Sequence, residues 1–352
     1  MTKQIKLKAK PRIAFVMLPR WKKNLFSEVD LNRLQSLVKM VESKADNLDE
    51  VAVKELLKDA DGIITSWGTP KLSLETLTAA KGLKVICHGA GSIKHVISQE
   101  TLKELLKNGM VITTTAPALG IGVAEFTLGL IICGLKKALF MREGMADGKW
   151  NEYIGRWNLS GPNELMPVEP YHVTVGVIGA GYCGSHLIKL LNNFEVKILV
   201  HDPHKSEEDC RKIGAEKSGL EHLMATSDVI TLHAPFTPQT EGMINKDLIS
   251  KIKDGALFVN TAIAREVDEE ALIRELQTGR FYACIDQTLA QPAPKDHPFR
   301  NMKNVFLTPH IAGHTSTGFL RQGKYAVDEL ERFFQNGKVK FGLKADKLAI
   351  IE

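Results

Sequence analysis

The sequence of 352 residues carries 46 Lys and Arg against 41 Asp and Glu, a formal net charge of +5, and 44% of it is hydrophobic. This length exceeds what one hydrophobic core usually serves, so two domains are expected. The basic residues form no block beyond the short stretch 3–10, and no aromatic residues alternate with them. This distribution argues against a nucleic-acid partner.

The cysteines show no CxxC and no Cys/His ligand spacing, so neither a metal site nor a disulfide framework is expected. They are Cys87, Cys133, Cys183, Cys210 and Cys284. Most lie in or beside apolar runs, which is typical of buried reduced thiols. The apolar run 13–18 is too short for a secretory signal, and the longest run, 126–135, is shorter than the roughly 18 residues of a membrane span. We expect a cytoplasmic protein without a membrane partner.

The first third of the chain alternates short apolar runs with helical patterns, as repeated βα units do. The expected strands are 12–17, 62–65, 84–87 and 111–114. The expected helices are 31–41, 51–57, 74–79 and 99–106. This pattern predicts a first doubly wound α/β unit.

A second series of apolar runs predicts a second, longer parallel sheet. Its expected strands are 173–178, 197–200, 229–232, 256–259, 281–285 and 305–307. Between the two series we expect an apolar helix over 123–139 and then a connecting arm over 150–170, which is rich in Gly, Pro, Asn and Trp. A helical pattern over 326–334 follows the last strand, so the tail is expected to return to the first domain.

A glycine-rich segment follows the strand 173–178 directly and opens a helical pattern over 185–191. In Gly179-Ala180-Gly181-Tyr182-Cys183-Gly184 the first Gly permits a tight turn, the second lets a pyrophosphate approach, and the third allows close helix packing. The phosphates would meet the helix N-terminus. Asp202 ends the next strand, where a carboxylate accepts hydrogen bonds from ribose hydroxyls and repels a 2′-phosphate. NAD is therefore predicted over NADP.

Beyond this loop the sequence resembles the D-2-hydroxyacid dehydrogenase family over nearly its whole length. The matching stretches, in the family's order, are Ser227-Asp228-Val229, Leu232-His233-Ala234-Pro235, Thr237-Pro238, Asn245, Lys253-Asp254-Gly255-Ala256, Val259-Asn260-Thr261-Ala262, Val267-Asp268-Glu269, Ala271-Leu272, Asp286, Pro292, Pro294, Asp296-His297-Pro298, Asn304-Val305 and Thr308-Pro309-His310-Ile311-Ala312-Gly313.

The resemblance implies two doubly wound domains, a flavodoxin-like substrate domain and an NAD-binding Rossmann domain inserted into it. We expect the substrate domain at 1–120 and 321–352 and the cofactor domain at 121–320. It also implies a homodimer through the cofactor domains. The expected cofactor contacts are Gly179, Gly181, Tyr182, Cys183, Gly184, Asp202, His233, Pro235, Thr240, Thr261, Ala262, Asp286, His310 and Gly313.

Family members use an Arg on the substrate carboxylate, a His as acid and base, and a Glu that orients the His. His310 fills the His position. Alignment to the family's N-T-A-R-G places Ile263 at the Arg, and alignment to D-x-x-x-x-E places Gln291 at the Glu. Ile binds no anion, and Gln is uncharged. Gln291 therefore leaves His310 near its unperturbed pKa of about 6.5 and mostly neutral at pH 7.

Arg265 stands two positions beyond Ile263 and would replace the missing Arg if the loop is shifted relative to the family. The alternative is a solvated loop arginine paired with Glu266 or another carboxylate. Asp286, whose counterpart in the family accepts from the nicotinamide carboxamide, is present.

In the first domain, Gly89, Ala90, Gly91 and Ser92 follow a strand, and their successive N–H groups could form an anion-binding concavity for substrate. A plain βα turn is the alternative. The stretch 113–117 departs from the family's N-T-P-G, and Leu119 replaces its usual Asn, so the cleft is expected to be more apolar than is typical.

These features predict an NAD(H)-dependent oxidoreductase acting on a hydroxy or keto substrate that need not be a simple 2-hydroxy acid. The alternative is an NAD(H)-binding sensor or scaffold without turnover.

Overall fold

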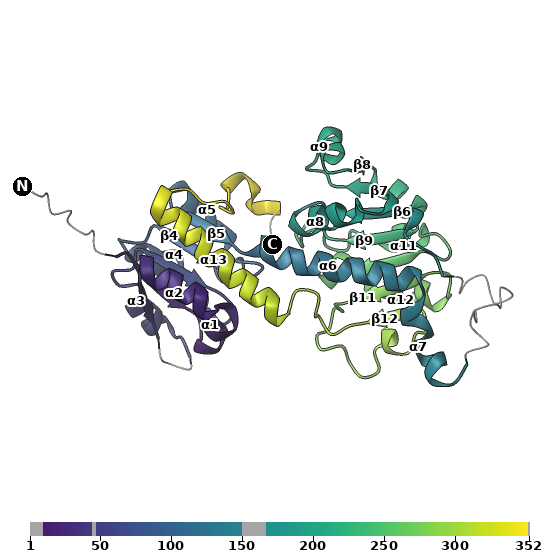
Figure 1. Ribbon diagram of the computed structural model, residues 1–352, viewed down its shortest axis with the longest axis horizontal. Coiled ribbons are helices and arrows are strands. Elements are labelled where there is room, and N and C mark those ends of the chain that lie inside the picture. The colour runs from purple at the N-terminus through teal and green to yellow at the C-terminus, as the bar shows by residue number, and fades with distance from the viewer. Residues whose placement is uncertain (1–9, 44–46, 150–166, 351–352) are drawn as a thin grey trace, which may run out of the picture. The chain divides into compact units, whose positions relative to one another are not determined.

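The computed structural model describes residues 10–43, 47–149 and 167–350 and divides into two compact units (Figure 1). Unit 1 comprises Met1–Leu119 and Thr315–Glu352, and unit 2 comprises Gly120–His314. Each unit contains one parallel sheet, so the predicted class of two parallel-sheet α/β domains is confirmed. Of the predicted arm at 150–170, residues 150–166 lie outside the described residues.

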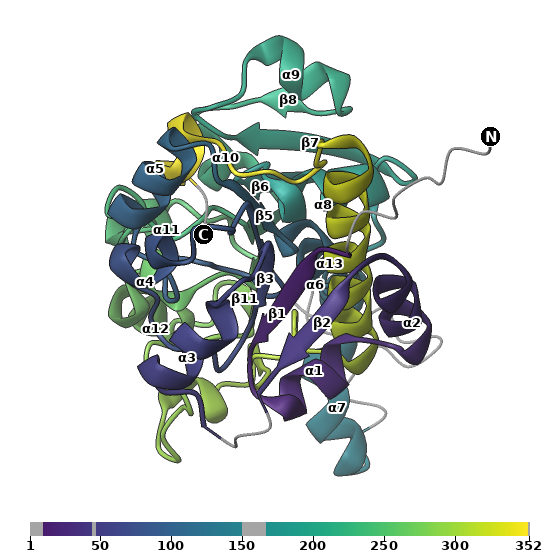
Figure 2. The ribbon, with the colours of Figure 1, turned by 90° about the vertical axis from the view of Figure 1, so that its left-hand side faces the viewer.

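The sheet of unit 1 has the order β2-β1-β3-β4-β5, all parallel (Figure 2). This is the flavodoxin-like order, in which the connections reverse between β1 and β3. The strands are β1 (Arg12–Val16), β2 (Lys39–Glu42), β3 (Gly62–Thr65), β4 (Val85–His88) and β5 (Val111–Thr114).

Helices cover both faces of this sheet, because alternate residues of β1 enter different cores. Ala14 and Val16 pack with Leu57, Leu77 and Leu102 in one core. The helices of that face are α3 (Glu50–Leu57), α4 (Leu74–Ala79) and α5 (Gln99–Lys107). Ile13 and Phe15 enter the second core, whose helices are α1 (Pro19–Leu25), α2 (Glu28–Leu37) and α13 (Ser316–Asn336).

The predicted helix 31–41 is wrong in its second half. The helix α2 ends at Leu37, and Val38 is already extended with φ −131°. The next four residues form the edge strand β2, whose first residue, Lys39, donates its backbone N–H to Pro11. Apolar residues at 38, 40 and 41 suit the outer strand of a sheet as well as a helix face, so periodicity alone did not separate them.

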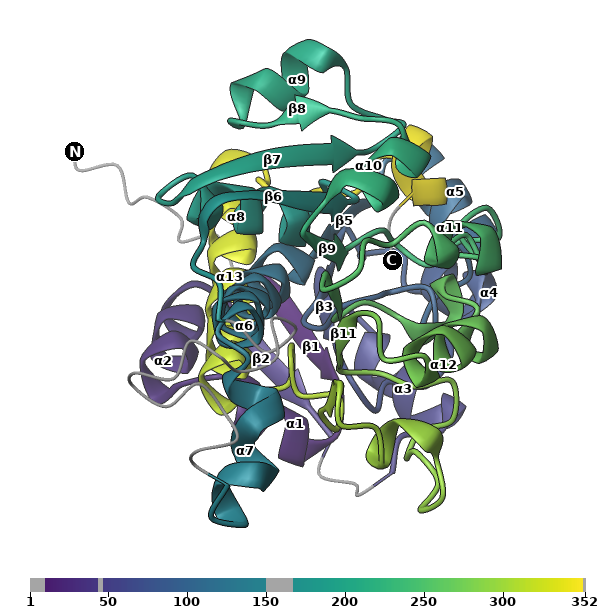
Figure 3. The ribbon, with the colours of Figure 1, turned by 90° about the vertical axis from the view of Figure 1, so that its right-hand side faces the viewer.

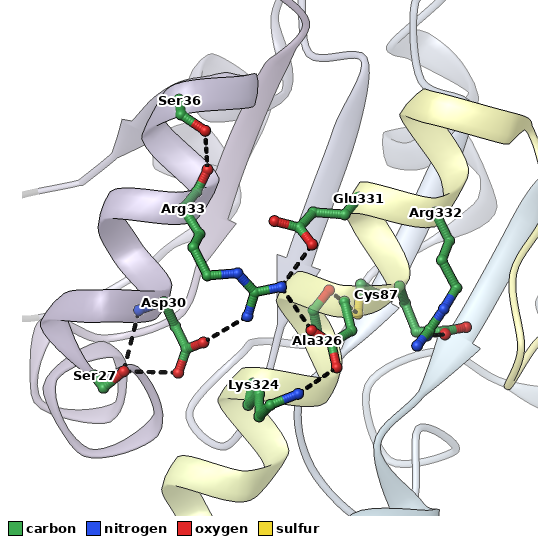
Figure 4. Close-up of polar contacts among 11 residues, drawn as sticks. Ser27, Asp30, Arg33, Ser36, Cys87, Lys324, Ala326, Glu331 and Arg332 are labelled. Atoms are coloured by element: carbon green, nitrogen blue, oxygen red, sulfur yellow. Dashed lines mark hydrogen bonds and ion pairs between the residues drawn. The ribbon is translucent and has the colours of Figure 1, made fainter.

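Arg33 ties α2 to the returning helix α13 (Figure 4). Its guanidinium lies 3.0 Å from Asp30 on its own helix, and 2.8 Å from Asp328 and 2.6 Å from Glu331 on α13. The hydrogen bonds to Asp328 and Glu331 raise the pKa of Arg33 above its ordinary value. One cation thus holds three carboxylates from segments almost 300 residues apart in the chain.

The tail after α13 stays within unit 1. Glu329, 1% exposed, accepts the backbone N–H groups of Lys340 and Phe341, each at 2.8 Å. Gly342 then forms an antiparallel bridge with Thr113 on β5. Because the tail runs along β5, the outer strand on that side gains backbone partners.

The sheet of unit 2 has seven parallel strands in the order β12-β11-β10-β9-β6-β7-β8 (Figure 3). This is the Rossmann order with one further strand, and its connections reverse between β6 and β9. The strands are β6 (Tyr171–Ile178), β7 (Glu195–His201), β8 (Glu216–Lys217), β9 (Val229–Leu232), β10 (Leu257–Asn260), β11 (Tyr282–Ile285) and β12 (Val305–Leu307).

Two cores also flank this sheet. One contains residues of α6 (Ala116–Leu135), α8 (Tyr182–Leu191) and α9 (Glu207–Lys212). The other contains residues of α10 (Leu220–Thr226), α11 (Lys246–Ser250) and α12 (Glu269–Gln277). The short 3-10 turns are η3 (Ala264–Glu266), η4 (Pro298–Arg300) and η5 (Ala345–Ile350).

The predicted helix 123–139 is two helices, α6 and α7 (Ala138–Ala146), separated where Lys137 adopts φ +56°. By length and composition, α6 alone among the described helices could cross a membrane. However, its Leu130, Ile131 and Leu135 are buried in the core of unit 2, as in a core helix of a soluble protein.

Candidate active site

The glycine-rich loop joins β6 to α8, and its three glycines meet different surroundings. Gly179 has φ +87°, and a Cβ there would lie 2.5 Å from the Ala234 nitrogen. A Cβ on Gly184 would lie 2.0 Å from the Gly179 carbonyl oxygen. A Cβ on Gly181 would meet nothing within 4 Å. The first and third glycines are thus required by packing, and the second faces open space, where a pyrophosphate could approach the backbone.

Asp202 follows β7 and is already anchored to the loop. Its Oδ2 accepts the Ala180 N–H at 2.9 Å, and its Oδ1 accepts the His204 N–H at 2.8 Å. The carboxylate is half-buried, so lone pairs remain for ribose hydroxyls. Asp202 therefore sets the geometry of the loop in addition to the predicted contact with ribose.

Tyr182 and Cys183 form the first turn of α8. Tyr182 is 51% exposed, and the Cys183 sulfur lies 3.3 Å from Nδ1 of His233, at the end of β9. Burial lowers the pKa of His233 to about 4, so the ring is neutral at pH 7. The pair lies at the carboxyl ends of the neighbouring strands β6 and β9, where the connections leave in opposite directions and doubly wound sheets bind ligands.

The segment after β9 is held by its own side chains. The Thr240 hydroxyl donates to the Pro235 carbonyl at 2.7 Å and accepts the Thr237 N–H at 2.8 Å. His233 donates its backbone N–H to Ile178 at the end of β6. The predicted contacts His233, Pro235 and Thr240 therefore lie on one rigid turn beside the glycine-rich loop.

His310 lies in the loop after β12 with φ +54°, a backbone conformation rare for a residue with a side chain. Asp286, which is 1% exposed, stabilises it. The Asp286 carboxylate accepts the N–H groups of Ile311 at 2.9 Å and Ala312 at 3.0 Å. The Asp286 backbone carbonyl accepts the His310 N–H at 2.8 Å. A role for Asp286 in holding the His310 loop was not predicted from the sequence.

The His310 ring is oriented by an amide. Its Nδ1 lies 2.8 Å from Oε1 of Gln291, whose Nε2 donates to Gln287 at 3.1 Å. Because an amide oxygen only accepts, Nδ1 carries the hydrogen and Nε2 is the nitrogen that can exchange a proton. The His310 pKa is lowered, first by burial and then by neighbouring His314, while Asp286 opposes the shift.

The residues after β10 are placed as follows. The Thr261 hydroxyl lies 2.9 Å from that of Thr127 on α6, and the Ala262 N–H donates to Asn260 at 3.0 Å. Ile263 precedes η3 and is half-buried. Arg265 is exposed, 2.7 Å from Glu241 and with its guanidinium 4.4 Å from the Phe236 ring centroid.

The structure thus gives Arg265 a carboxylate partner that the sequence did not identify. Gly313, the last predicted cofactor contact, is half-buried in the His310 loop.

In unit 1, the loop of Gly89, Ala90, Gly91 and Ser92 is held by its carbonyl groups. The Ser66 hydroxyl donates to the Gly89 carbonyl at 3.0 Å. The Thr115 hydroxyl donates to the Ala90 carbonyl at 3.3 Å, and the Thr114 hydroxyl donates to the Gly91 carbonyl at 3.4 Å. In a trans peptide the N–H points opposite to the C=O, so the next N–H groups face away from those hydroxyls. Leu119 packs on this loop, since a Cβ on Gly91 would lie 3.0 Å from it.

Sequence reasoning missed three site neighbours: Gln287, Glu241 and His314. The His314 ring lies 4.8 Å from that of His310. The sequence offers one indication of this contact: His314 lies four residues beyond His310, and a tight loop brings residues at that spacing close together.

The chain is similar in sequence and fold to known proteins. Residues 128–312 match the NAD binding domain of D-isomer specific 2-hydroxyacid dehydrogenases. A glyoxylate reductase of Thermofilum pendens is 32% identical over 280 residues, 78% of each chain. A D-3-phosphoglycerate dehydrogenase of Archaeoglobus fulgidus is 29% identical over 82% of this chain and 52% of its own length. An NAD+-bound 3-phosphoglycerate dehydrogenase of Entamoeba histolytica superposes with a TM-score of 0.64, at 26% identity, over 96% of this chain and 99% of that one.

Proposed function

Because the chain belongs to the D-isomer specific 2-hydroxyacid dehydrogenase family, we propose that it is an oxidoreductase in which His310 exchanges a proton with the hydroxyl or carbonyl oxygen of a substrate. NAD, the cofactor of this family, supplies or accepts the hydride when bound. The observation that carries the proposal is the hydrogen bond from His310 Nδ1 to Gln291, because it leaves Nε2 as the proton-exchanging atom.

The residues of unit 2 fit NAD. The open side of Gly181 and the uncapped N-terminus of α8 suit a pyrophosphate. Asp202 suits the ribose hydroxyls, since a carboxylate accepts their hydrogen bonds. The nicotinamide end is assigned to the residues after β10 and in the His310 loop: Thr261, Ala262, Asp286 and Gly313.

The proton step favours oxidation over reduction near neutral pH. Reduction needs the protonated imidazole to give a proton to the carbonyl oxygen, and oxidation needs the neutral ring to take one. The lowered pKa of His310 keeps the ring neutral. A carboxylate in place of Gln291 would raise that pKa, but the amide carries no charge.

The proposed substrate class rests on two features, each taken within its own unit. Ile263 offers no cation to a carboxylate. In unit 1, the N–H groups of Ala90, Gly91 and Ser92 face away from the hydroxyls that hold the loop, beside the apolar Leu119, and we assign them to a carbonyl or carboxylate oxygen. A substrate with an apolar substituent, and not necessarily a 2-hydroxy acid, fits this chemistry.

The test is NADH consumption against a panel of keto acids, aldehydes and ketones, together with NAD reduction by the matching alcohols. We expect turnover of at least one uncharged substrate, abolished by His310→Gln, which keeps a polar side chain. NADH binding without turnover on the whole panel would overturn the proposal in favour of an NAD(H)-binding sensor.

We further infer a homodimer through unit 2. Fewer than half of the residues in the most apolar 18-residue stretch of α6 are buried. Ile121, Leu128 and Ile132 share one half-exposed stripe of that helix, with Gly129 and Cys133 beside them. Sedimentation should give a dimer for the natural chain and a monomer for Ile132→Glu, because Leu128 also packs against the core of unit 2. A cytoplasmic location is proposed on the three buried free thiols Cys87, Cys210 and Cys284, which suit a reducing compartment.

A further inference from the structure

The first turn of α8 carries a thiol beside a buried imidazole. Cys183 Sγ lies 3.3 Å from His233 Nδ1, and Cys183 is partly exposed. His233 is only 9% exposed, and its other ring nitrogen, Nε2, has no hydrogen-bond partner among the described residues. The imidazole therefore has one polar neighbour on the cofactor loop, and that neighbour is sulfur.

The orphaned nitrogen fixes the tautomer. A buried N–H without an acceptor is rarer and costlier than a bare ring nitrogen, so the hydrogen belongs on Nδ1, facing Cys183. An N–H donor directed at sulfur stabilises the thiolate over the thiol.

The helix adds to this effect. Cys183 is the second residue of α8, no side chain caps the helix, and its first turn contains no acidic residue. The positive end of the helix dipole also favours the thiolate. The opposing charge on this loop is Asp202, whose carboxylate is directed to the N–H groups of Ala180 and His204.

We propose that Cys183 is a redox-sensitive thiol that forms a mixed disulfide with a soluble disulfide and thereby prevents NAD from binding at the glycine-rich loop. The Cys183 thiolate attacks one sulfur of the soluble disulfide. A new S–S bond forms, the original S–S bond breaks, and the second half leaves as a thiolate that takes a proton from water. Cys183 is oxidised and the soluble disulfide is reduced.

The modification would block NAD because it places a bulky group on the turn where the pyrophosphate meets backbone N–H groups. Bound NAD would in turn cover the sulfur. Modification and cofactor binding are therefore mutually exclusive. The inference rests on the proposed NAD site, but the reactivity of the thiol does not.

The experiment uses Cys133→Ser as background, because Cys133 is also exposed. Glutathione disulfide is the probe, and mass spectrometry locates the adduct. We expect an adduct on Cys183, protection by saturating NADH, and at least about a tenfold loss of NADH affinity, restored by dithiothreitol. Cys183→Ser should show the same NADH affinity with and without glutathione disulfide.

Two variants of the imidazole test the cause. His233→Leu removes the donor and should slow the adduct about tenfold, since a thiol returned to its ordinary pKa is a few per cent thiolate at pH 7. His233→Asn keeps an N–H near the Nδ1 position and should retain most of the rate. Equal rates in all three chains, or an adduct that leaves NADH binding intact, would overturn the proposal. Failure of the unmodified chain to bind NADH would instead overturn the cofactor assignment, because the labelling rates do not depend on NADH.

Discussion

The ring of His314 stands edge-on to that of His310, with centroids 4.8 Å apart, and its Nδ1 lies 3.2 Å from the His310 carbonyl oxygen. The carbonyl only accepts, so Nδ1 of His314 carries a hydrogen and the ring is held against its neighbour. The neighbouring His314 is one of the causes that lower the pKa of His310.

We expect His314→Asn to raise the pKa of His310, because it removes a group that lowers it. At a fixed pH a larger fraction of His310 is then protonated. The limb of the reductive pH profile should therefore move to higher pH, and the oxidative limb should move with it. NMR titration of the His310 ring measures this directly. The exposed His222→Gln serves as control, and an unchanged or lower His310 pKa in His314→Asn would contradict the prediction.

The double change Ile263→Arg with Gln291→Glu should create or raise 2-keto acid reductase activity. The Arg supplies a charge-assisted contact to a carboxylate, about 1.5–3 kcal/mol or one to two decades in kcat/KM. The Glu supplies charge at the atom that now accepts from His310 and so raises its pKa. Arg alone should mainly improve binding, and Glu alone should mainly shift the pH profile upward, because the two act as a unit. A double variant that binds NADH but reduces no keto acid would refute the assignment of these positions.

Asp202→Asn should relax the preference for NADH over NADPH, at the cost of one of the two backbone hydrogen bonds that Asp202 accepts. The amide keeps an oxygen for the Ala180 N–H, but its NH2 group cannot accept the His204 N–H, and the charge that repels a 2′-phosphate is lost. Asp202→Ala loses both, so its NADH affinity should fall further. Calorimetric titration of both dinucleotides gives the ratio. Equal affinity of the unaltered chain for both would show that Asp202 does not select the cofactor.

Gly181→Ala should weaken NADH binding, whereas Gly184→Ala should lower the stability of unit 2. Gly181 has φ −72°, and its added Cβ meets nothing, so the variant should keep its thermal stability yet bind NADH at least tenfold more weakly. Gly184→Ala drives a Cβ against a backbone oxygen and should destabilise unit 2 by about 1–3 kcal/mol. Urea unfolding and NADH titration separate the two outcomes. Full NADH affinity in Gly181→Ala would mean that the pyrophosphate does not approach this residue.

Arg33→Met should destabilise unit 1 by about 1–2 kcal/mol, because three carboxylates lose one shared cation that is only 34% exposed. Lys54→Met is the matched control, since it breaks a single exposed pair with Glu50 and should leave the stability nearly unchanged. Chemical unfolding compares them. Equal losses in the two variants would show that the network adds nothing beyond an ordinary surface pair.

The central strands were predictable because each is a run of buried apolar residues, and the runs at 62–65 and 229–232 coincide with β3 and β9. Edge strand β2 was not, since its burial is only partial and its pattern fits a helix too. The short helices α1, α9 and α11 span seven, six and five residues, too few for a period to show.

Some features of the site could likewise be predicted from the sequence and others could not. The glycine spacing carries its own geometric requirement, so the loop could be read from the sequence. The anchoring of His310 by Asp286 could not, because backbone N–H groups are its donors and every residue except proline has one. The partners of Arg265 depend on how two loops meet, which no local pattern records.

The return of α13 to unit 1 sets an order of events during protein synthesis. Unit 2 is a continuous stretch of chain and can fold as it leaves the ribosome, whereas unit 1 lacks one of its helices until residues after Thr315 emerge. At about 5–20 residues per second the delay is on the order of tens of seconds. During this delay the apolar side chains of Leu25, Leu34 and Val38 lack their packing partners Val327 and Leu330 on α13. Premature termination before α13 should therefore leave a nascent chain that chaperones hold, with a folded cofactor domain and an open first domain.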